Sequence, residues 1–418
     1  MIVGSGGREH AMARALASGP GVEILTAPGN PGTAALGTNL DLPADDVPAL
    51  VATARDHRVE LVVPGPEGPL VAGLADALVA AGIRCAGPGR AAARLEASKA
   101  FTRQVAAEAG VRSPVHRLVS DPAEIEAALA GFADPPVVKA DGLAAGKGVM
   151  LPDDFDECRR LGRELLGGGL GEAGRRIVLE ERLFGIEASL FYACRGTAFV
   201  ALPHARDHKR LLEGDQGPNT GGMGAVSPNP AVGTDLERQV ADEIIRPVLR
   251  VMVDRGTPFH GFLFAGLMLT TSGPALLEFN VRLGDPEAQA ILPRIEQGRF
   301  LEVCSWVAGQ GEDPPHFGID PDPTCAVVLA AAGYPESPRR GDPIEIDPAV
   351  ERPDRWFIHA GTAAGGGGLI TAGGRVGAVV ARGGDATTAR RLAYDGVRLV
   401  RWEGMTYRRD VGAEVNGG

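Results

Sequence analysis

Short apolar runs alternate with amphipathic stretches over the first 90 residues of the chain. The runs that fit strands lie at 2–3, 23–25, 60–63 and 83–85. The stretches between them, such as 69–79, carry apolar residues at helical spacing. Short strands alternating with helices are typical of a parallel βαβ sheet. We therefore predict a parallel βαβ domain over 1–95.

A single helix is predicted over 91–109. Phe101, Val105 and Ala109 recur every four residues and would form its apolar stripe. Lys99 precedes Phe101 by two residues, which is about 200° around a helix. We therefore expect Lys99 to face away from the stripe.

Beyond this helix the pattern predicts a central domain over 96–313 and a C-terminal α+β domain over 322–418. Strands with hairpin-like connections are predicted over 135–192, and strands followed by a helix over 259–306. The proline-rich stretch 314–323 marks the junction. The chain as a whole is predicted to be an α/β protein.

Composition narrows the class of protein. The net charge is −11 and basic runs do not exceed two or three residues, which argues against binding of nucleic acid or of an anionic membrane. The apolar run at 262–269 is far shorter than a membrane span, and the first residues do not resemble a signal peptide. Five widely spaced cysteines without a C-x-x-C pair indicate reduced thiols. We expect a soluble cytoplasmic protein.

Lysine is rare in this chain. Of 42 basic residues only four are lysines, at Lys99, Lys139, Lys147 and Lys209. An ammonium group differs physically from the planar fork of arginine. Lysines that remain in so arginine-rich a sequence are candidates for positions where arginine cannot replace lysine. The alternative is that these four lysines remain by chance.

The stretch KADGLAAGKGV, beginning at Lys139, indicates a phosphate-binding flap. It is not a Walker A loop, because three residues separate Gly142 from Gly146, and Gly148 stands where a Ser or Thr would follow Lys147. Strand-like residues follow the loop, so the pattern predicts a glycine-rich hairpin with a lysine on its first strand and another at its tip. Such a loop brings backbone N–H groups close to phosphate oxygens. The alternative is a surface hairpin without a function.

The stretch 275–287 predicts a metal site. As a strand it would place Glu278, Asn280 and Arg282 on one face. The other face is apolar: Leu277, Phe279 and Val281. Carboxylate and amide oxygens suit Mg²⁺, which completes its shell with phosphate oxygens and water. Arg282 suits a carboxylate or a developing phosphoryl charge. The alternative is an exposed polar face.

Two glycine-rich segments suggest further binding loops. The segment 206–210 is highly charged, and the following 217–224 contains four glycines, which indicates close backbone approach to a ligand or simply a flexible loop. The N-terminal VGSGGREH has Glu9 where a dinucleotide fingerprint needs its third glycine. We interpret it as a site for a sugar phosphate at the start of a helix, with a plain tight turn as the alternative.

These motifs together resemble the glycinamide ribonucleotide synthetase (phosphoribosylamine–glycine ligase) family of ATP-grasp enzymes, over nearly the whole chain. The matching stretches are GGREH from Gly6, APGN from Ala27, GPE from Gly65, LEASKAF from Leu95, KADGLAAGKGV from Lys139, DHKR from Asp207, GPNTGGMGA from Gly217 and EFNVRLGDPE from Glu278. The resemblance implies an ATP-grasp fold with an N-terminal parallel βαβ domain, a flap subdomain at about 113–182 and a small C-terminal α+β domain.

The resemblance also implies the reaction. ATP would phosphorylate the carboxylate of glycine to glycyl phosphate, and the amine of 5-phosphoribosylamine would displace the phosphate, giving glycinamide ribonucleotide in purine biosynthesis. The partners would be ATP, glycine and 5-phosphoribosylamine, with Mg²⁺ or Mn²⁺ as cofactor. We expect a monomer or a weak dimer.

Roles for individual residues follow from the same resemblance. ATP would be bound by Lys99, Lys139, Gly142, Gly146, Lys147, Gly148, Glu180, Glu181, Leu183 and Glu187. The metal would be held by Glu278 and Asn280. Asp207 and Arg282 would clamp the glycine amine and carboxylate, with Asp285 near the reacting centre. The substrates would also contact Gly6, Gly7, Arg8, Asn30, Glu67, Asn219, Gly222 and Gly224.

Rival interpretations remain open at this point. Another ATP-grasp ligase or a carboxylase of nucleotide metabolism would share the Glu–Asn pair, although not DHKR together with PNTGGMG. A nucleotide-sensing binding protein and an NAD oxidoreductase fit less well. The chain starts about three residues short of the family's usual first strand. The run 262–269 contains no further acid, so the number of metal ions is open.

Overall fold

The structure, a computed structural model, describes residues 1–144 and 148–413. Its N-terminal part is a five-stranded parallel sheet in the order β3-β2-β1-β4-β5, as the alternating pattern predicts. The strands are β1 (Ile2–Gly4), β2 (Leu25–Pro28), β3 (Thr38–Asn39), β4 (Leu61–Pro64) and β5 (Arg84–Cys85). The helices are α1 (Gly7–Ala17), α2 (Pro31–Ala34), α3 (Val47–Asp56), α4 (Glu67–Ala72) and α5 (Leu74–Ala80). The loops after β1, β2 and β4 therefore meet at one edge, where parallel sheets bind ligands.

The predicted single helix over 91–109 is two helices, so that prediction is wrong. They are α6 (Arg90–Ala97) and α7 (Lys99–Glu108), separated by Ser98 in an extended conformation. The Ser98 hydroxyl accepts from the Phe101 N–H, and the Asp141 carboxylate accepts from the Ala100 N–H at 2.7 Å. These two acceptors satisfy the first turn of a new helix, which begins at Lys99.

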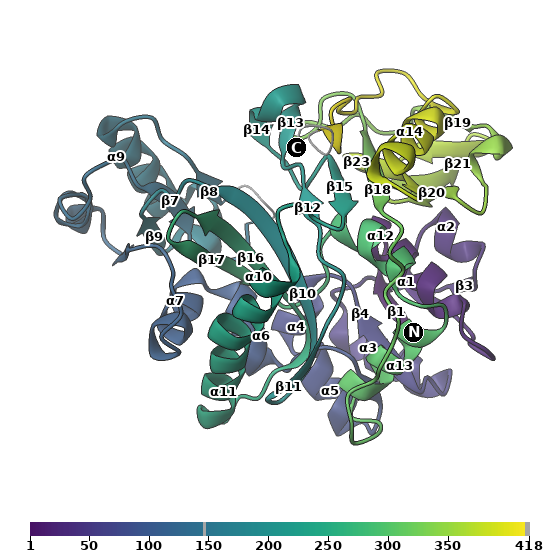
Figure 1. Cartoon of the computed structure of the whole chain (residues 1–418), viewed down its shortest axis with the longest axis horizontal. Helices are drawn as coiled ribbons and strands as arrows, with labels where there is room; N and C mark the ends of the chain where they lie inside the picture. Colours follow the sequence, from purple (N-terminus) through teal and green to yellow (C-terminus); the bar gives the residue numbers. More distant parts are fainter. Residues whose placement is uncertain (145–147, 414–418) are drawn as a thin grey trace.

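The flap subdomain forms a separate lobe at the upper left of Figure 1. Its antiparallel sheet has the order β6-β9-β7-β8, and its interior is a cluster of its own that includes Val138, Ile177 and Leu179. The elements are β6 (His116–Val119), α8 (Ile125–Leu129), β7 (Val137–Ala140), β8 (Val149–Met150), α9 (Phe155–Glu164) and β9 (Ile177–Glu180).

The hairpin β7–β8 agrees with the predicted flap, but α9 contradicts the prediction of strands alone over 135–192. Most of its residues are charged, but Phe155, Cys158 and Leu161 recur every three residues on one face, so a helical pattern was present in the sequence and was missed. Its start is set locally by Asp154, whose side chain accepts from the Glu157 N–H at 2.7 Å.

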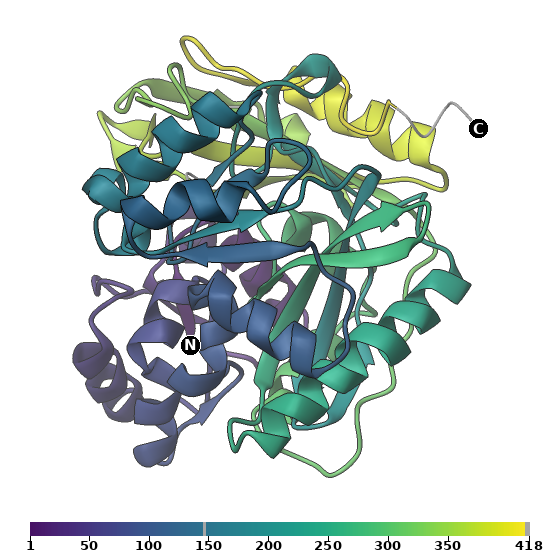
Figure 2. The same cartoon turned by 90° about the vertical axis from the view of Figure 1, so that its left-hand side faces the viewer.

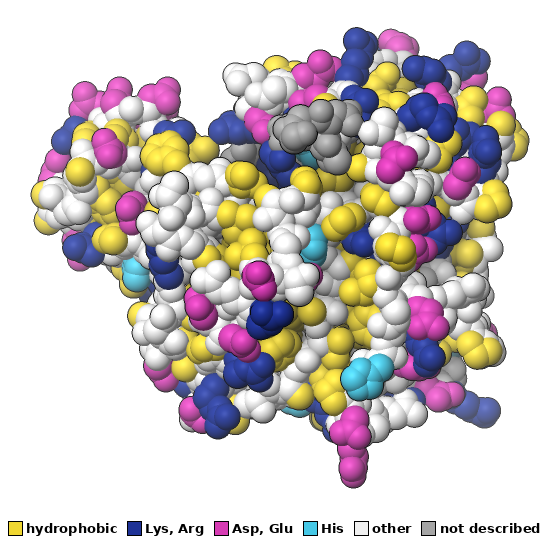
Figure 3. Space-filling view, in the orientation of Figure 1, with side chains coloured by type: hydrophobic (Ala, Val, Ile, Leu, Met, Phe, Trp, Pro, Cys, Tyr) yellow, Lys and Arg dark blue, Asp and Glu magenta, His cyan; other side chains and the backbone are white. Residues whose placement is uncertain are grey.

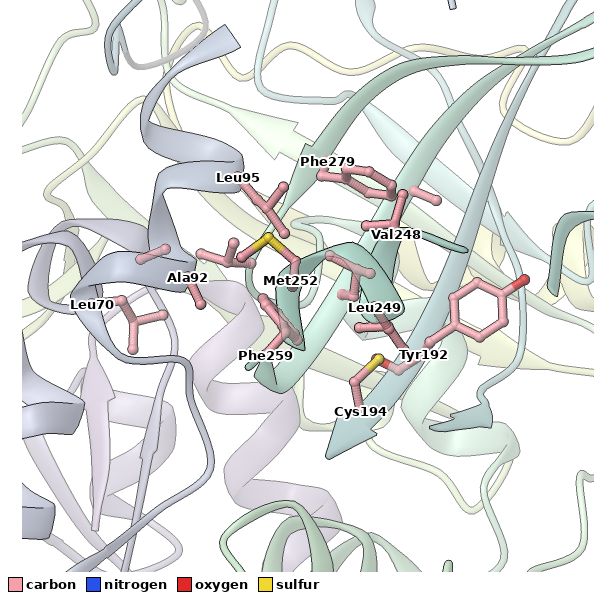
Figure 4. Close-up of a cluster of buried hydrophobic side chains, with 14 of the residues drawn as sticks. Leu70, Ala92, Leu95, Tyr192, Cys194, Val248, Leu249, Met252, Phe259 and Phe279 are labelled. Atoms are coloured by element: carbon pink, nitrogen blue, oxygen red, sulfur yellow. The ribbon is translucent and has the colours of Figure 1, made fainter. Parts of the chain in front are cut away.

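The central sheet is antiparallel, in the order β11-β10-β16-β17. It comprises β10 (Ile186–Arg195), β11 (Ala198–Ala201), β16 (His260–Thr270) and β17 (Gly273–Asn280). Helices α10 (Thr234–Val240) and α11 (Arg246–Asp254) lie across it in Figures 1 and 2. Figure 4 shows Leu249 and Met252 of α11 in one buried cluster with Phe279 of the sheet and Leu95 of α6. One core thus joins the N-terminal domain to the central sheet.

A bulge in β17 changes which side chains face this core. Gly266 of β16 pairs with Glu278 while Leu267 pairs with Leu276, so Leu277 is the extra residue. Leu276, and not Leu277, is fully buried in the core, whereas Leu277 lines the cavity described below. The prediction that Leu277 shares the face of Phe279 and Val281 is therefore wrong.

The C-terminal sheet draws strands from two distant parts of the chain. Its order is β12-β15-β18-β23-β20, with β12 (Arg206–Asp207), β15 (Gly224–Ser227), β18 (Thr324–Ala330), β20 (Arg355–His359) and β23 (Arg375–Arg382). A second small sheet has the order β21-β22-β19-β24, with β19 (Pro343–Ile346), β21 (Thr362–Gly365), β22 (Gly368–Thr371) and β24 (Val400–Arg401). Residues 206–227 thus extend the sheet of the last hundred residues, across the predicted boundary between the second and third domains.

The remaining elements connect these units. They are the hairpin β13 (Arg210–Leu212) and β14 (Gln216–Asn219), and the helices α12 (Glu287–Ile291), α13 (Arg299–Val307) and α14 (Ala386–Val397). Short 3₁₀ or π segments lie at Pro122–Glu124, Leu165–Gly169, Gly171–Gly174, Glu213–Asp215, Ala241–Ile245, Leu292–Arg294 and Pro348–Val350. On the face in Figure 3, acidic and basic side chains are interspersed. Within 1–144 and 148–413, none of the helices has the length and apolar character needed to cross a bilayer.

The separate core of the flap lobe leads to a stability prediction. Leu179→Ala removes a buried side chain from that cluster and should destabilise the lobe by about 2–5 kcal/mol. Limited proteolysis with mass spectrometry should then show early cleavage within 113–182. The control, Leu329→Ala, lies in the C-terminal cluster and should leave that stretch protected. Equal protection of the lobe in both variants would contradict an independent flap unit.

Candidate active site

A cavity of about 460 Å³ lies where the N-terminal domain, the central sheet with its flap lobe and the C-terminal sheet meet. Ten of the predicted site residues line it: Arg8, Glu67, Lys99, Gly142, Gly148, Asp207, Glu278, Asn280, Arg282 and Asp285. They come from the ligand edge of the parallel sheet, the start of α7, the flap hairpin, the end of β17 and the strand β12. Residues more than 270 positions apart are therefore brought to one chamber.

The other predicted residues that the structure describes do not line this cavity: Gly6, Gly7, Asn30, Lys139, Glu180, Glu181, Leu183, Glu187, Asn219, Gly222 and Gly224. Gly146 and Lys147 lie outside the described residues. Gly222 is directly behind the wall, because a Cβ at this position would be 2.7 Å from Asp207 Oδ1. Gly224 instead packs against β18, where a Cβ would be 2.7 Å from the Ala326 carbonyl oxygen.

A buried ion network lies behind the lysine end of the cavity. Glu180, 1% exposed, accepts from Arg103 Nε at 2.7 Å and from Arg103 Nη2 at 2.9 Å, and its Oε2 is 2.6 Å from Lys139 Nζ. Burial would raise the pKa of Glu180, but Lys139 and Arg103 outweigh it and lower the pKa to about 2. Arg103 also donates to the carbonyls of Leu276 and Leu277. The Glu180 carboxylate thus fixes Lys139 relative to β17.

Glu278 faces a group of cations. Burial would raise its pKa, yet Lys209, Lys139, Lys99 and Arg282 together hold the pKa below its ordinary value. Burial beside Lys139 lowers the pKa of Lys99, although Glu278 opposes this. The carboxylate is therefore ionised in a positively charged chamber, which is a suitable environment for a polyphosphate and a divalent cation.

The donor set also fits Mg²⁺. Glu278 and Asn280 offer two hard oxygens from one strand end to the cavity. In the described ranges 1–144 and 148–413, no group of three or more His, Cys, Asp or Glu side chains is placed to hold a metal. A metal held by two protein oxygens needs phosphate oxygens and water for the rest of its shell, and Mg²⁺ usually binds in this way.

Arg282 is fixed between two carboxylates of the N-terminal half. Its Nη2 is 2.9 Å from Glu96 Oε1 and its Nε is 3.3 Å from Glu67 Oε2. The second oxygen of Glu96 accepts from the Val281 N–H at 2.7 Å. Burial raises the pKa of Glu96 to about 7 against the opposing charge of Arg282. The orientation of the guanidinium is thus set before any substrate enters.

The opposite end of the cavity is acidic. Oδ1 of Asp207 is buried and has no hydrogen-bond partner among the residues that the structure describes, and Glu287, 4% exposed, lines the same chamber. Burial, together with the neighbouring carboxylate of Glu287, raises the pKa of Asp207 well above its ordinary value. Burial also raises the pKa of Glu287. Two carboxylates whose charges are poorly compensated form a natural site for an ammonium group.

Asp285 lies between the N-terminal turn and the C-terminal sheet. Arg375 Nη2 is 3.1 Å from Asp285 Oδ2, and Gln289 Nε2 donates to Oδ1 at 2.7 Å. Burial would raise the pKa of Asp285, but Arg375 and Arg8 hold it below the ordinary value. The carboxylate therefore stays ionised at neutral pH.

The predicted sugar-phosphate turn opens α1. Gly6 is the N-cap of this eleven-residue helix, and a Cβ there would be 3.4 Å from Asp285 Oδ2. Asn30 is buried, and its side chain is fully engaged. It accepts from the Gly32 and Thr33 N–H groups and donates to the carbonyls of Ser5 and His359. Asn30 thus ties the turn to α2 and to β20.

The predicted adenine hinge connects β9 to β10. The Glu181 N–H donates to the Val115 carbonyl oxygen, and the Val115 N–H donates to the Glu181 side chain at Oε2. Glu187 Oε2 is 3.2 Å from Lys209 Nζ. This pair connects the hinge to the acidic end of the cavity.

Sequence reasoning missed several residues of the chamber. Glu96 and Glu287 lie inside motifs that were recognised but were given no role, and Lys209 is one of the four lysines. Arg103 and Arg375 have no local signal, because their partners are more than 70 residues away in the chain.

Comparison with known proteins agrees with this architecture. Residues 1–96, 97–288 and 324–414 match the N, ATP-grasp (A) and C domains of phosphoribosylglycinamide synthetase. A phosphoribosylamine–glycine ligase of Rhizobium meliloti is 43% identical over 413 residues, which cover 99% of this chain and 97% of the relative. The ligase of the same name from Streptomyces coelicolor is 43% identical, with 100% and 99% covered.

Solved structures give the same picture. The crystal structure of phosphoribosylamine–glycine ligase from Thermotoga maritima has a TM-score of 0.86 at 34% identity, covering 98% of each chain. The biotin carboxylase domain of 2-oxoglutarate carboxylase from Hydrogenobacter thermophilus has a TM-score of 0.75 at 13% identity, covering 97% of this chain and 90% of that one, which shows a shared fold alone. This chain therefore belongs to the phosphoribosylamine–glycine ligase family and has the ATP-grasp fold.

Proposed function

We propose that this cavity binds Mg-ATP, glycine and 5-phospho-D-ribosylamine together and carries out the ligation in two steps. The overall reaction is that of the family: glycine and the amine are joined at the cost of ATP hydrolysis to ADP and phosphate, in purine biosynthesis. The proposal for the residues is supported by a phosphate-binding end and an amine-binding end in one chamber.

In the first step a carboxylate oxygen of glycine attacks the γ-phosphorus, ADP leaves, and glycyl phosphate forms. Lys99 and Lys139 neutralise the phosphate chain, and the flap backbone at Gly142 and Gly148 covers it. Glu278 and Asn280 would hold Mg²⁺ or Mn²⁺, which would supply charge neutralisation and alignment of the phosphates. Because the Glu180 side chain is engaged with Lys139 and Arg103, the hinge at Glu181 and Leu183 binds adenine through backbone atoms.

Glycine lies between the acidic end and Arg282. Asp207 and Glu287 receive its ammonium group, and Arg282 binds its carboxylate, with Glu96 and Glu67 fixing the guanidinium. Asp207 is packed against Gly222, which in turn is packed against Pro286. A substrate side chain would have to displace this close-packed wall, so glycine is preferred.

In the second step the amine of phosphoribosylamine attacks the carbonyl carbon of glycyl phosphate, and phosphate leaves with one carboxylate oxygen. The turn at Gly6, Gly7 and Arg8 receives the phosphate of the sugar at the start of α1, because a helix N-terminus and the Arg8 guanidinium favour anions. The Gly6 N–H itself already donates to the Glu9 carboxylate. Asn30 holds this turn in place. Asp285, beside the turn, lies between the two substrates.

Glu67, Glu187 and Asn219 have supporting roles in this scheme. Glu67 acts on substrate binding indirectly, because it is paired with Arg282 and helps to orient the guanidinium that binds the glycine carboxylate. Glu187 reaches the ribose of ATP only by sharing or leaving its contact with Lys209. Asn219 pairs with Arg210 at the open end of the hairpin β13–β14 and orients the glycine-rich loop that follows.

The observation that carries the proposal is the buried Asp207 Oδ1, which has no hydrogen-bond partner within 1–144 and 148–413 and lies in a chamber that also holds Glu278, Asn280, Lys99 and Lys209. Purified protein should release ADP from Mg-ATP and phosphoribosylamine only when glycine is added, and the product should have the mass of glycinamide ribonucleotide. ADP release that needs bicarbonate or formate instead of glycine would contradict the substrate assignment.

Asp207→Asn should weaken glycine binding selectively. Loss of a charged hydrogen-bond acceptor costs about 1.5–3 kcal/mol, so the KM for glycine should rise about 10- to 100-fold while the KM for ATP stays within about twofold. Steady-state kinetics with each substrate varied in turn measures both. The control is Asp342→Asn, which breaks an ion pair with Arg339 outside the cavity. An unchanged KM for glycine in Asp207→Asn would contradict the ammonium site.

Glu180→Gln should lower stability in a pH-dependent way. A folded-state pKa of about 2 against the ordinary 4.5 corresponds to about 3 kcal/mol, present above pH 4.5 and lost as the pH falls towards 2. Urea denaturation should show the variant less stable than the wild type by about this amount at pH 7, with a gap that narrows below pH 4.5.

The KM for ATP should rise in the same variant, because Lys139 loses its partner. Glu345→Gln removes an exposed partner of Arg401 and serves as the control with little effect on stability. A difference in the free energy of unfolding between Glu180→Gln and wild type that does not change with pH would contradict the buried ion network.

A further inference from the structure

One guanidinium group of the C-terminal sheet enters the chamber. Arg375, at the start of β23, donates through Nη1 to the carbonyl oxygens of Gly221, Gly222 and Asp285. Its distance to the Asp285 carbonyl oxygen is 2.6 Å, and its Nη2 is 3.1 Å from the Asp285 carboxylate. A single side chain therefore connects the glycine-rich loop to the turn that carries Asp285.

The glycine-rich loop is held from a second side as well. The Gly221 N–H donates to the Tyr334 hydroxyl at 3.0 Å, and Tyr334 also belongs to the C-terminal part of the chain. Gly221 lies flat on the guanidinium, since a Cβ at this position would be 3.0 Å from Arg375 Cζ. The loop has no room for a side chain between these two contacts.

The same loop forms part of the environment of Asp207. The neighbouring Gly222, at φ +111°, lies against both Pro286 and Asp207, because a Cβ there would clash with Pro286 Cδ and would be 2.7 Å from Asp207 Oδ1. Asp207 is on β12, which is connected to β23 through β15 and β18 of one sheet. Arg375 and Asp207 are thus fixed relative to each other by continuous strand pairing.

We propose that Arg375 is a positioning residue for the ligation, which holds the loop at Gly221 and the Asp285 carboxylate in register around the bound glycine. The C-terminal sheet then completes the active site and does not merely cover it. This inference rests on the proposed roles of Asp207 and Asp285. Arg375 acts through them and through the loop backbone, without itself contacting the reacting atoms.

The test compares Arg375→Ala with Arg375→Lys. The alanine variant loses several hydrogen bonds made by a charged group, so kcat should fall about 10- to 100-fold. The KM for ATP should stay within about twofold, because the lysines that bind phosphate are at the other end of the chamber. Lysine supplies one compact charge instead of a fork and should restore kcat only in part.

Chemical rescue distinguishes positioning from a loss of folding. Guanidinium chloride at millimolar concentration should raise the kcat of Arg375→Ala several-fold and leave wild type unchanged. Gly221→Ala keeps the charge but places a methyl group against Arg375 Cζ, and should lower kcat in the same direction. Absence of rescue together with a wild-type rate in Gly221→Ala would overturn the proposal.

The matched control is Arg382→Ala, at the other end of the same strand. Arg382 is paired with Asp320 at 2.6 Å, away from the cavity. The Arg382→Ala variant should unfold at a temperature similar to that of Arg375→Ala but should have the kcat and KM values of the wild type. Equal loss of kcat in both variants would show that only the strand matters and would overturn the proposal.

Failure of this inference differs from failure of the proposed function. A fully active Arg375→Ala with a strongly impaired Asp207→Asn would remove Arg375 alone. An unimpaired Asp207→Asn would remove the glycine site itself, whatever Arg375 does.

Discussion

The Glu180 carboxylate is the contact on which the rest of the site depends. It is buried, and it is stable as an anion only because Arg103 and Lys139 both reach it. Arg103 comes from α7, Lys139 from β7 and Glu180 from β9, and Arg103 also holds two carbonyls of β17. Lys139 and the strand that carries Glu278 and Asn280 are therefore fixed by one network. Loss of any member would leave a buried charge without its partner.

A second constraint comes from the sheet that crosses the chain. Strand β12 carries Asp207 and strand β23 carries Arg375, yet almost 170 residues separate them in sequence. Their shared sheet makes the acidic end of the cavity rigid, while the flap lobe has a separate core and contributes the hairpin β7–β8 to the cavity. Rigidity at one end and an independent lobe at the other suit an enzyme that must admit ATP and then exclude water. In the proposed scheme, the same division assigns the C-terminal unit to the glycine site and the flap lobe to the nucleotide site.

The sequence predicted those features that are encoded locally. The parallel sheet, the strand at 375–382 and the Glu278–Asn280–Arg282 alternation depend on neighbouring residues, and the structure contains each of them. The break at Ser98 was missed because its second acceptor, Asp141, arrives from 43 positions away. The bulge at Leu277 was missed because register is set by the partner strand β16. Arg375 could not be found, since its role exists only where three distant loops meet.

In the proposed reaction, a carboxylate oxygen of glycine becomes bonded to phosphorus before the amide forms. The most direct measurement uses glycine labelled with ¹⁸O in both carboxylate oxygens, together with Mg-ATP and phosphoribosylamine, followed by mass spectrometry of the products. The account predicts one ¹⁸O atom in the released phosphate, one in the glycinamide ribonucleotide and none in ADP. Released phosphate that contains no ¹⁸O would contradict the formation of glycyl phosphate.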